Sequence, residues 1–227
     1  TKLVRGGLFR SNHGETSEAI FMNSGYVFNS AEEAKARFAG ELEGYLYSRY
    51  GNPTVSMFEE RMALNEGAEA CFATASGMSA VFASLLSYLK SGDHVVSSRS
   101  LFGSCYHIID QILPRYGIVT HLIDGTDLSQ WEKHVTNKTK CIFLESPSNP
   151  TMEIIDIASV VKIAHHHNAL VIVDNILASP VLQKPIEFGA DIVVYSGTKH
   201  IDGQGRSLGG AILSSKKHYE DYLKLIA

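Results

Sequence analysis

The sequence has few cysteines, no long apolar run and no apolar leader segment. Its three cysteines, Cys71, Cys105 and Cys141, are far apart among apolar or small neighbours, which argues against a disulfide framework or a Cys-x-x-Cys metal site and predicts reduced thiols. No uninterrupted apolar run approaches the ~18 residues of a membrane span, and the first residues have no core of the signal-peptide type. A cytoplasmic protein without a membrane partner is therefore expected.

The sequence also has no large excess of positive or negative charge. The 227 residues carry a formal net charge of -4, with 19% charged and 44% hydrophobic residues. These values are typical of a soluble globular chain and give no reason to expect a nucleic-acid or membrane-surface partner. The length suits one large domain or two small ones, and it leaves small-molecule chemistry open.

Short apolar segments alternate with helical segments from residue 69 onward. The expected strands cover residues 70–73, 93–96, 118–123, 141–144, 170–173, 191–194 and 210–213, and the expected helices cover residues 77–90, 103–115, 127–134 and 156–168. The strands lack clean polar alternation, so both faces of the sheet should be covered. The pattern predicts an α/β fold with a mainly parallel seven-stranded sheet and helices on both faces.

The residues before this pattern are interpreted as an arm. Residues 1–29 are expected to be irregular, followed by a helix at 30–40 and a helix that begins at Pro53. The predicted organisation is an N-terminal arm with the first helix at residues 1–45 and a large α/β domain at residues 46–227. A last helix is expected at residues 218–227, and because it ends on an apolar residue without a cap, the natural chain is expected to continue.

One lysine follows the expected strand at residues 191–194. Lys199 lies in the segment Tyr-Ser-Gly-Thr-Lys-His-Ile-Asp-Gly-Gln-Gly-Arg, residues 195–206, among small and hydroxylated neighbours. An ammonium group at the end of a buried strand is poorly solvated, so it must have an anionic partner, lose its proton or react. We therefore expect Lys199 to be buried and to take part in chemistry.

Other polar groups also follow strands, at the edge where open α/β sheets bind ligands. They are Ser76, Gly77 and Met78 after the first strand, Phe102 after the second, Glu145, Ser146 and Asn149 after the fourth, and Asp174 after the fifth. Each alone has a simpler explanation as a cap, a metal ligand or a solvated side chain. Together, a lysine, an aspartate, an aromatic ring and a helix start that can hold a phosphate suit pyridoxal phosphate, an aldehyde cofactor with a pyridinium ring.

Five blocks of the sequence resemble the pyridoxal-phosphate enzymes of cysteine and methionine metabolism, which include cystathionine synthases and lyases, methionine γ-lyase and homoserine-ester sulfhydrylases. The blocks are Tyr47–Thr54, Ala75–Met78, Glu145–Pro150, Val173–Asn175 and Ser196–Lys199. The resemblance spans nearly the whole chain. It implies the large domain of the PLP-transferase type I (aspartate-aminotransferase-like) fold, pyridoxal 5'-phosphate as the cofactor, a dimer of dimers, and a C-terminal small domain that is absent here.

The resemblance also implies a role for ten residues. Lys199 is the catalytic Schiff-base lysine, Asp174 is the partner of the pyridine nitrogen, Asn149 lies near the phenolic oxygen and Phe102 stacks on the ring. The phosphate would be bound by the amides of Gly77 and Met78, by the hydroxyls of Ser196 and Thr198, and by Tyr47 and Arg49 of a neighbouring subunit.

Two departures from the family pattern favour one branch. Many members have a tyrosine where this chain has Phe102, and the usual Ser-Ala-Thr-Lys is here Ser-Gly-Thr-Lys. Phenylalanine cannot exchange a proton, which suits a leaving group such as succinate that needs little protonation. The segment Lys199–Arg206 also resembles the O-succinylhomoserine sulfhydrylase branch. The predicted reaction is γ-replacement, in which O-succinylhomoserine and sulfide give homocysteine and succinate, as in methionine biosynthesis.

Several alternatives remain. Within the family these are cystathionine γ-synthase and methionine or cystathionine γ-lyase activities, and neither the acyl group nor the choice of sulfide or cysteine is decided by these residues. A noncatalytic fragment is a third possibility. A nicotinamide-dependent oxidoreductase is disfavoured because Gly203–Gly209 has the wrong spacing for a dinucleotide loop. No metal is expected at His165–His167, since adjacent helical positions do not share a face.

Overall fold

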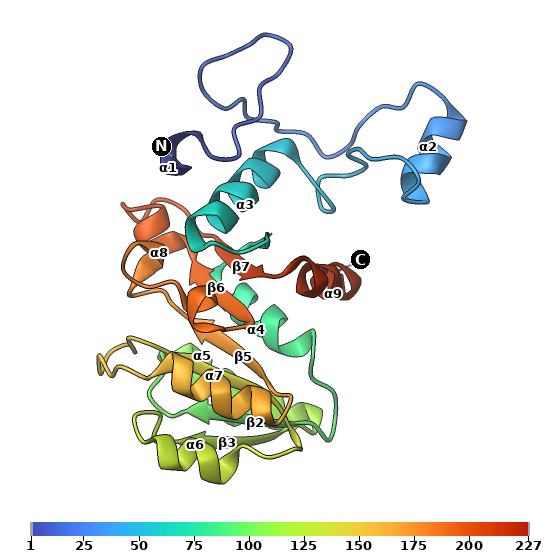
Figure 1. Ribbon diagram of the computed structural model, residues 1–227. Helices are drawn as coiled ribbons and strands as arrows, with labels where there is room; N and C mark the ends of the chain where they lie inside the picture. The colour runs from blue at the N-terminus through green and yellow to red at the C-terminus, as the bar shows by residue number, and fades with distance from the viewer. Residues whose placement is uncertain (1, 227) are drawn as a thin grey trace.

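Seven strands form one mixed sheet in the computed structural model, which describes residues 2–226 (Figure 1). The strands are β1 (Ala70–Thr74), β2 (His94–Ser98), β3 (Val119–Ile123), β4 (Thr139–Glu145), β5 (Leu170–Asp174), β6 (Ile192–Ser196) and β7 (Gly210–Ser214). Their order is β1-β7-β6-β5-β4-β2-β3, and only the pairs that involve β7 are antiparallel. The predicted mainly parallel seven-stranded sheet is confirmed.

The helices that the sequence predicted are all present, and short ones are added to them. The helices are α1 (Lys2–Arg5), α2 (Ala31–Phe38), α3 (Pro53–Glu66), α4 (Gly77–Leu86), α5 (Gly103–His107), α6 (Leu128–His134), α7 (Ile157–His166), α8 (Ser179–Leu182) and α9 (Lys216–Ile226). The helical path of α5 continues through a π-helical turn at Ile108–Ile112 and a 3-10 turn at Leu113–Tyr116. Helices α1 and α8 were not predicted, because four residues are too few for a hydrophobic period, and α1 corrects the expectation that residues 1–29 are irregular throughout.

Apolar side chains cover both faces of the sheet. On β4, Ile142 and Leu144 belong to a core that α6 and α7 complete, whereas Cys141 and Phe143 belong to a second core under α4 and α5. Successive side chains of a strand point to opposite faces, so one uninterrupted apolar run supplies two cores. The prediction of helices on both faces is confirmed.

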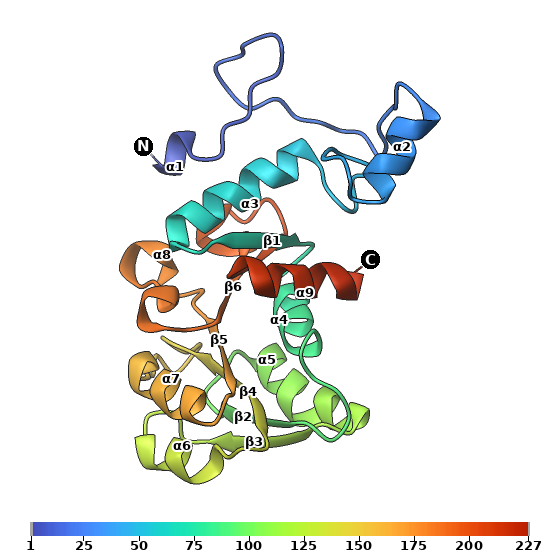
Figure 2. The same ribbon diagram turned by 45° about the vertical axis from the view of Figure 1, so that its right-hand side comes forward.

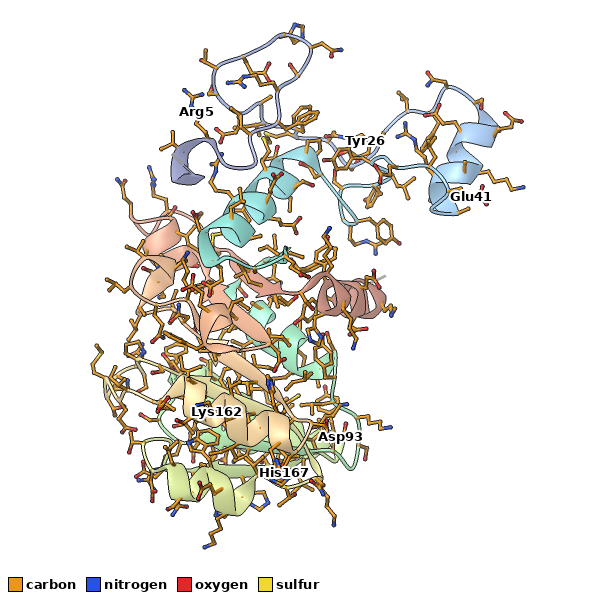
Figure 3. All side chains as sticks on the ribbon, in the orientation of Figure 1. Arg5, Tyr26, Glu41, Asp93, Lys162 and His167 are labelled. Atoms are coloured by element: carbon orange, nitrogen blue, oxygen red, sulfur yellow. The ribbon has the colours of Figure 1, made fainter. Side chains whose placement is uncertain are left out.

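The N-terminal arm projects away from the sheet, with α2 near its far end (Figures 1 and 2). Arg5, Tyr26 and Glu41 lie on this arm, whereas Asp93, Lys162 and His167 lie with the sheet and its helices (Figure 3). The arm exposes large apolar side chains, among them Met22 and Val27, each 93% exposed. It returns to the body at α3, where Thr54 Oγ1 accepts a hydrogen bond of 2.9 Å from the Phe21 amide.

Within residues 2–226, no helix is both long and apolar enough to cross a membrane. The described side chains contain no group of three or more His, Cys, Asp or Glu that could hold a metal ion. His165 and His167 instead make separate hydrogen bonds, to Asp191 and Asn137 respectively. The three cysteines are free and buried.

Candidate active site

A cavity of about 230 Å³ opens at the carboxyl ends of the parallel strands β4, β5 and β6. It brings together eight of the ten residues that the sequence predicted, namely Gly77, Met78, Phe102, Asn149, Asp174, Ser196, Thr198 and Lys199. The other two, Tyr47 and Arg49, are not among its lining residues. These eight residues come from different strands, helices and loops, which the sheet brings together at one edge.

Two buried carboxyl groups lie side by side in the cavity wall. Glu145 and Asp174 are register partners at the ends of β4 and β5, and both line the cavity. Burial, together with the nearby Glu145, raises the pKa of Asp174 to about 7. Burial also raises the pKa of Glu145 to about 7, although two backbone amides oppose the shift. No described lysine or arginine forms an ion pair with either carboxyl, so this wall is suited to a positively charged group from outside the chain.

The N-terminus of α4 lies directly against the end of β6. A Cβ atom on Gly77 would be 2.6 Å from Ser196 Cβ and 3.0 Å from Ser196 Oγ, so only glycine fits there. Ser76 caps the helix, with its hydroxyl accepting a bond of 3.1 Å from the Ser79 amide. The first amides of a helix have no acceptor within the helix and carry its positive dipole end. The hydroxyl of Ser196 beside these amides is an arrangement that can hold a phosphate.

Lys199 is exposed, and the expectation that it would be buried is wrong. Strand β6 ends at Ser196, and a π-helical turn at Gly197–Ile201 takes Lys199 beyond the sheet, where it lines the cavity. Its backbone is non-helical, with φ −90° and ψ −117°. Gly197 packs against the returning chain, where its amide donates a bond of 2.7 Å to Gly209 O and an added Cβ would lie 3.1 Å from Gly209 C. This contact favours glycine in the Ser-Gly-Thr-Lys segment.

Tyr47 and Arg49 lie apart from the cavity, in the segment that joins the arm to α3. Both are exposed, and the Arg49 guanidinium lies 4.5 Å from the centroid of the Tyr50 ring. They border a shallow hollow of about 610 Å³ together with residues 21–24. That they serve a neighbouring subunit stays a prediction.

The structure adds residues that the predicted set of ten does not contain. Glu145 lines the cavity; the sequence had indicated it as a polar group after the fourth strand but assigned it no role. Tyr195 also lines it, with its buried hydroxyl donating to Glu66 Oε2 and accepting from Asn175 Nδ2, both at 2.6 Å. Glu66 is 129 residues from Tyr195 in the sequence, so no local pattern could have paired them.

A larger cavity, of about 700 Å³, lies between α3 and α8 and contains none of the ten predicted residues. Most of its lining residues belong to α3 or lie around α8, and His200 and Ile201 also line it. Because it lacks Lys199 and the carboxyl pair of Glu145 and Asp174, the smaller cavity is the better candidate for chemistry.

Comparisons with known proteins show the family of this chain. The family model described as Cys/Met metabolism PLP-dependent enzyme matches residues 1–227. A protein of Mycobacterium tuberculosis (strain ATCC 25618 / H37Rv), named O-succinylhomoserine sulfhydrylase, is 56% identical over 217 residues, which are 96% of this chain and 53% of that protein. An L-methionine gamma-lyase of Fusobacterium nucleatum subsp. polymorphum is 39% identical over 218 residues, 96% of this chain and 55% of that protein.

A solved structure also matches closely. It is that of a putative O-acetylhomoserine (thiol)-lyase from Campylobacter jejuni subsp. jejuni NCTC 11168, with a TM-score of 0.91 and 35% sequence identity, covering 97% of this chain and 55% of that one. That structure contains N'-pyridoxyl-lysine-5'-monophosphate. The chain spans about half the length of the curated relatives it matches. The resemblance on which the prediction of family and fold depended is confirmed.

Proposed function

Because the chain belongs to the family of Cys/Met metabolism PLP-dependent enzymes, we propose that it forms the cofactor-binding part of an O-succinylhomoserine sulfhydrylase. The single observation that supports this most strongly is the cavity that gathers Lys199, Asp174 and the N-terminus of α4. The reaction would join sulfide to the homoserine carbon skeleton and release succinate. The 56% identical relative with this name supports the choice of reaction.

The residues of the cavity fit pyridoxal phosphate by three independent features. Asp174 and Glu145 form a buried acidic wall without a cationic partner among the described residues, which suits a protonated ring nitrogen. The close contact of Gly77 with Ser196 leaves helix amides and a hydroxyl together, which suits a phosphate. Lys199 at the rim of the same cavity supplies an amine that an aldehyde can reach.

Each residue then has a defined task. When bound, pyridoxal phosphate supplies an aldehyde that condenses with amines and a ring that withdraws electrons from the neighbouring substrate carbon. Lys199 would hold the cofactor covalently and, once the substrate amine has displaced it, move protons at Cα and Cβ. Asp174 would keep the proton on the ring nitrogen, and Asn149 would lie near the phenolic oxygen. Phe102 would cover the ring face without exchanging a proton.

We further propose that the protein is a homo-oligomer, a dimer of dimers, in which Tyr47 and Arg49 reach the cavity of a neighbouring subunit. The arm that leads to them projects from the body and exposes Met22 and Val27, which favours burial against another subunit. The Arg49 guanidinium makes no ion pair with a described carboxylate, so it is free to bind a phosphate.

A cytoplasmic location is part of the proposal. Cys71, Cys105 and Cys141 are all buried and unpaired. Burial raises the pKa of the Cys141 thiol to about 12, which makes it a poor nucleophile. Unpaired structural thiols of this kind are typical of a reducing compartment.

Methionine γ-lyase activity is the second candidate, because a 39% identical relative has that name. The presence of Phe102 speaks against it, since a phenylalanine cannot protonate a departing thiolate. The same argument applies to the other lyase reaction of the family. Cystathionine γ-synthase activity would differ only in its use of cysteine in place of sulfide.

The test is a panel of donors and acceptors, assayed on this chain and on any longer form of the protein. O-succinylhomoserine and O-acetylhomoserine are offered with sulfide or cysteine, and methionine is offered alone. We expect homocysteine from O-succinylhomoserine and sulfide, at a rate at least tenfold above the other combinations. Methanethiol from methionine as the main product would contradict the proposal and favour the lyase. Absence of turnover in every form would favour a noncatalytic role.

A further inference from the structure

Glu145 connects two segments of the chain that both line the cavity but are far apart in the sequence. It is fully buried at the end of β4. Its Oε2 accepts a hydrogen bond of 2.6 Å from the Phe102 amide, and its Oε1 accepts one of 3.1 Å from the Asn149 amide. Phe102 precedes α5 and Asn149 follows β4, and both line the cavity. One carboxyl group therefore holds two segments that the sheet itself does not hold.

These two hydrogen bonds should fix the positions of the Phe102 and Asn149 segments more strongly than ordinary loop contacts do. Phe102 is the residue before the first turn of α5, and no side chain caps that helix. Phe102 is 43% exposed, so packing alone does not fix the segment. Hydrogen bonds to an ionised acceptor are shorter and stronger than neutral ones, and loss of the acceptor would leave two partly buried amides without their partner.

The same carboxyl also contributes charge. Glu145 lies beside Asp174 in register, and the two face one cavity with no cationic partner among the described side chains. Cys105 and Tyr195 are the other weakly acidic groups that line the cavity, and both stay neutral because burial raises the pKa of each. The wall can thus present one or two negative charges to a ring, and its only cation from the described chain is Lys199 at the rim.

We propose that Glu145 is a positioning residue for the cofactor. Its two hydrogen bonds hold Phe102 and Asn149 at the cavity, and its carboxyl group adds to the attraction that Asp174 exerts on a cationic ring. The proposal rests on the proposed function, since it assumes that this cavity binds pyridoxal phosphate. It assigns to Glu145 no contact with the reacting atoms.

The test compares Glu145→Gln with a matched control, Glu59→Gln. Glu59 is a half-buried carboxyl with a raised pKa that also accepts a backbone bond, of 2.7 Å from the Ala73 amide, but it does not line the cavity. Three quantities are measured: amide hydrogen exchange of residues 100–104 and 147–151 without cofactor, the dissociation constant of added pyridoxal phosphate, and the circular dichroism of the bound cofactor. Glu145→Asp is a second variant in case the first does not fold.

In Glu145→Gln the side chain keeps one acceptor oxygen in place of two, so we expect at least tenfold faster exchange in at least one of the two segments. We also expect at least tenfold weaker cofactor binding and loss of half or more of the dichroic signal. Glu59→Gln should leave all three at wild-type values even if its melting temperature falls. Wild-type cofactor affinity and dichroism in Glu145→Gln would overturn the proposal, whatever happens to stability. If the wild-type protein itself bound no pyridoxal phosphate, the proposed function would fail, while the exchange data would still report whether Glu145 holds the two segments.

Discussion

Gly77 and Ser196 are in contact at the edge of the cavity, although they are far apart in the sequence: a Cβ atom on Gly77 would lie 2.6 Å from Ser196 Cβ and 2.9 Å from its Cα. This contact brings the N-terminus of α4 to the end of β6. The amides of one element and the hydroxyl of the other thereby become available to the same phosphate.

Gly77→Ala should therefore weaken phosphate binding. The new methyl group must push α4 away from β6, since the atoms it meets are backbone and a short side chain. We expect the dissociation constant for pyridoxal phosphate to rise at least tenfold, as measured by titration. Gly103→Ala is the matched control, because it also lies at a helix start but an added Cβ there meets no atom within 4 Å. Equal effects of the two substitutions would contradict the prediction.

Lys199→Ala should abolish covalent attachment of the cofactor. After incubation with pyridoxal phosphate and reduction with borohydride, the wild-type chain is expected to retain the added mass, and the variant is not. Lys184→Ala tests selectivity, since Lys184 borders the larger cavity instead. Stable labelling of the Lys199 variant would show that another amine forms the bond.

Asp174→Asn should stabilise the protein without cofactor while weakening cofactor binding. Asp174 is buried beside Glu145, so its ionised form is unfavourable at pH 7.5, whereas an amide oxygen can still accept the bond from the Ile176 amide. We expect the free energy of unfolding to rise by about 1 kcal/mol, as for other functional residues held in costly environments. Urea unfolding and cofactor titration measure the two effects, and an unchanged cofactor affinity would be evidence against a ring-nitrogen partner.

Acidic pH should stabilise the cofactor-free protein. Burial raises the pKa of Glu59, Glu66, Glu145 and Asp174 to about 7. Between the usual carboxyl pKa of about 4 and pH 7 the folded state thus binds more protons than the unfolded state, so stability falls as the pH rises. Each group can lower the free energy of unfolding by at most about 1.4 kcal/mol per pH unit.

Urea unfolding at pH 5.5 and pH 7.5 measures this loss. Glu66→Gln should show a smaller loss than the wild type, because a glutamine does not titrate and the buried Glu66 is one of the four contributing groups. A higher free energy of unfolding of the wild-type protein at pH 7.5 than at pH 5.5 would contradict the prediction.

Arg49 is expected to act on a neighbouring subunit, and mixed oligomers can test this. Arg49→Ala and Lys199→Ala should each be inactive alone. A mixed dimer would contain one site with both an intact lysine and an intact arginine, so activity should return to about a quarter of the wild-type value after random mixing. Activity that stays absent in verified mixed oligomers would indicate that Arg49 acts within its own subunit or not at all.

Local patterns in the sequence determined much of this protein. The seven apolar runs predicted seven strands, and their lack of alternation predicted helices on both faces, because period and composition are properties of neighbouring residues. The position of Gly77, Asp174 and Lys199 after strands predicted one shared edge, since parallel strands end on the same side. Short elements such as α8 were not predicted, because four residues are too few to show a helical hydrophobic period.

Only the tertiary structure decided which distant residues meet. The order of strands places β6 between β5 and β7, and this order, which is not a local property, sets Ser196 against Gly77 and Tyr195 against Glu66. The exposure of Lys199 likewise depends on a turn that continues past the sheet edge. Chemistry-bearing residues can be recognised one at a time from their neighbours, but their distances, charges and shared hydrogen bonds depend on how the elements pack.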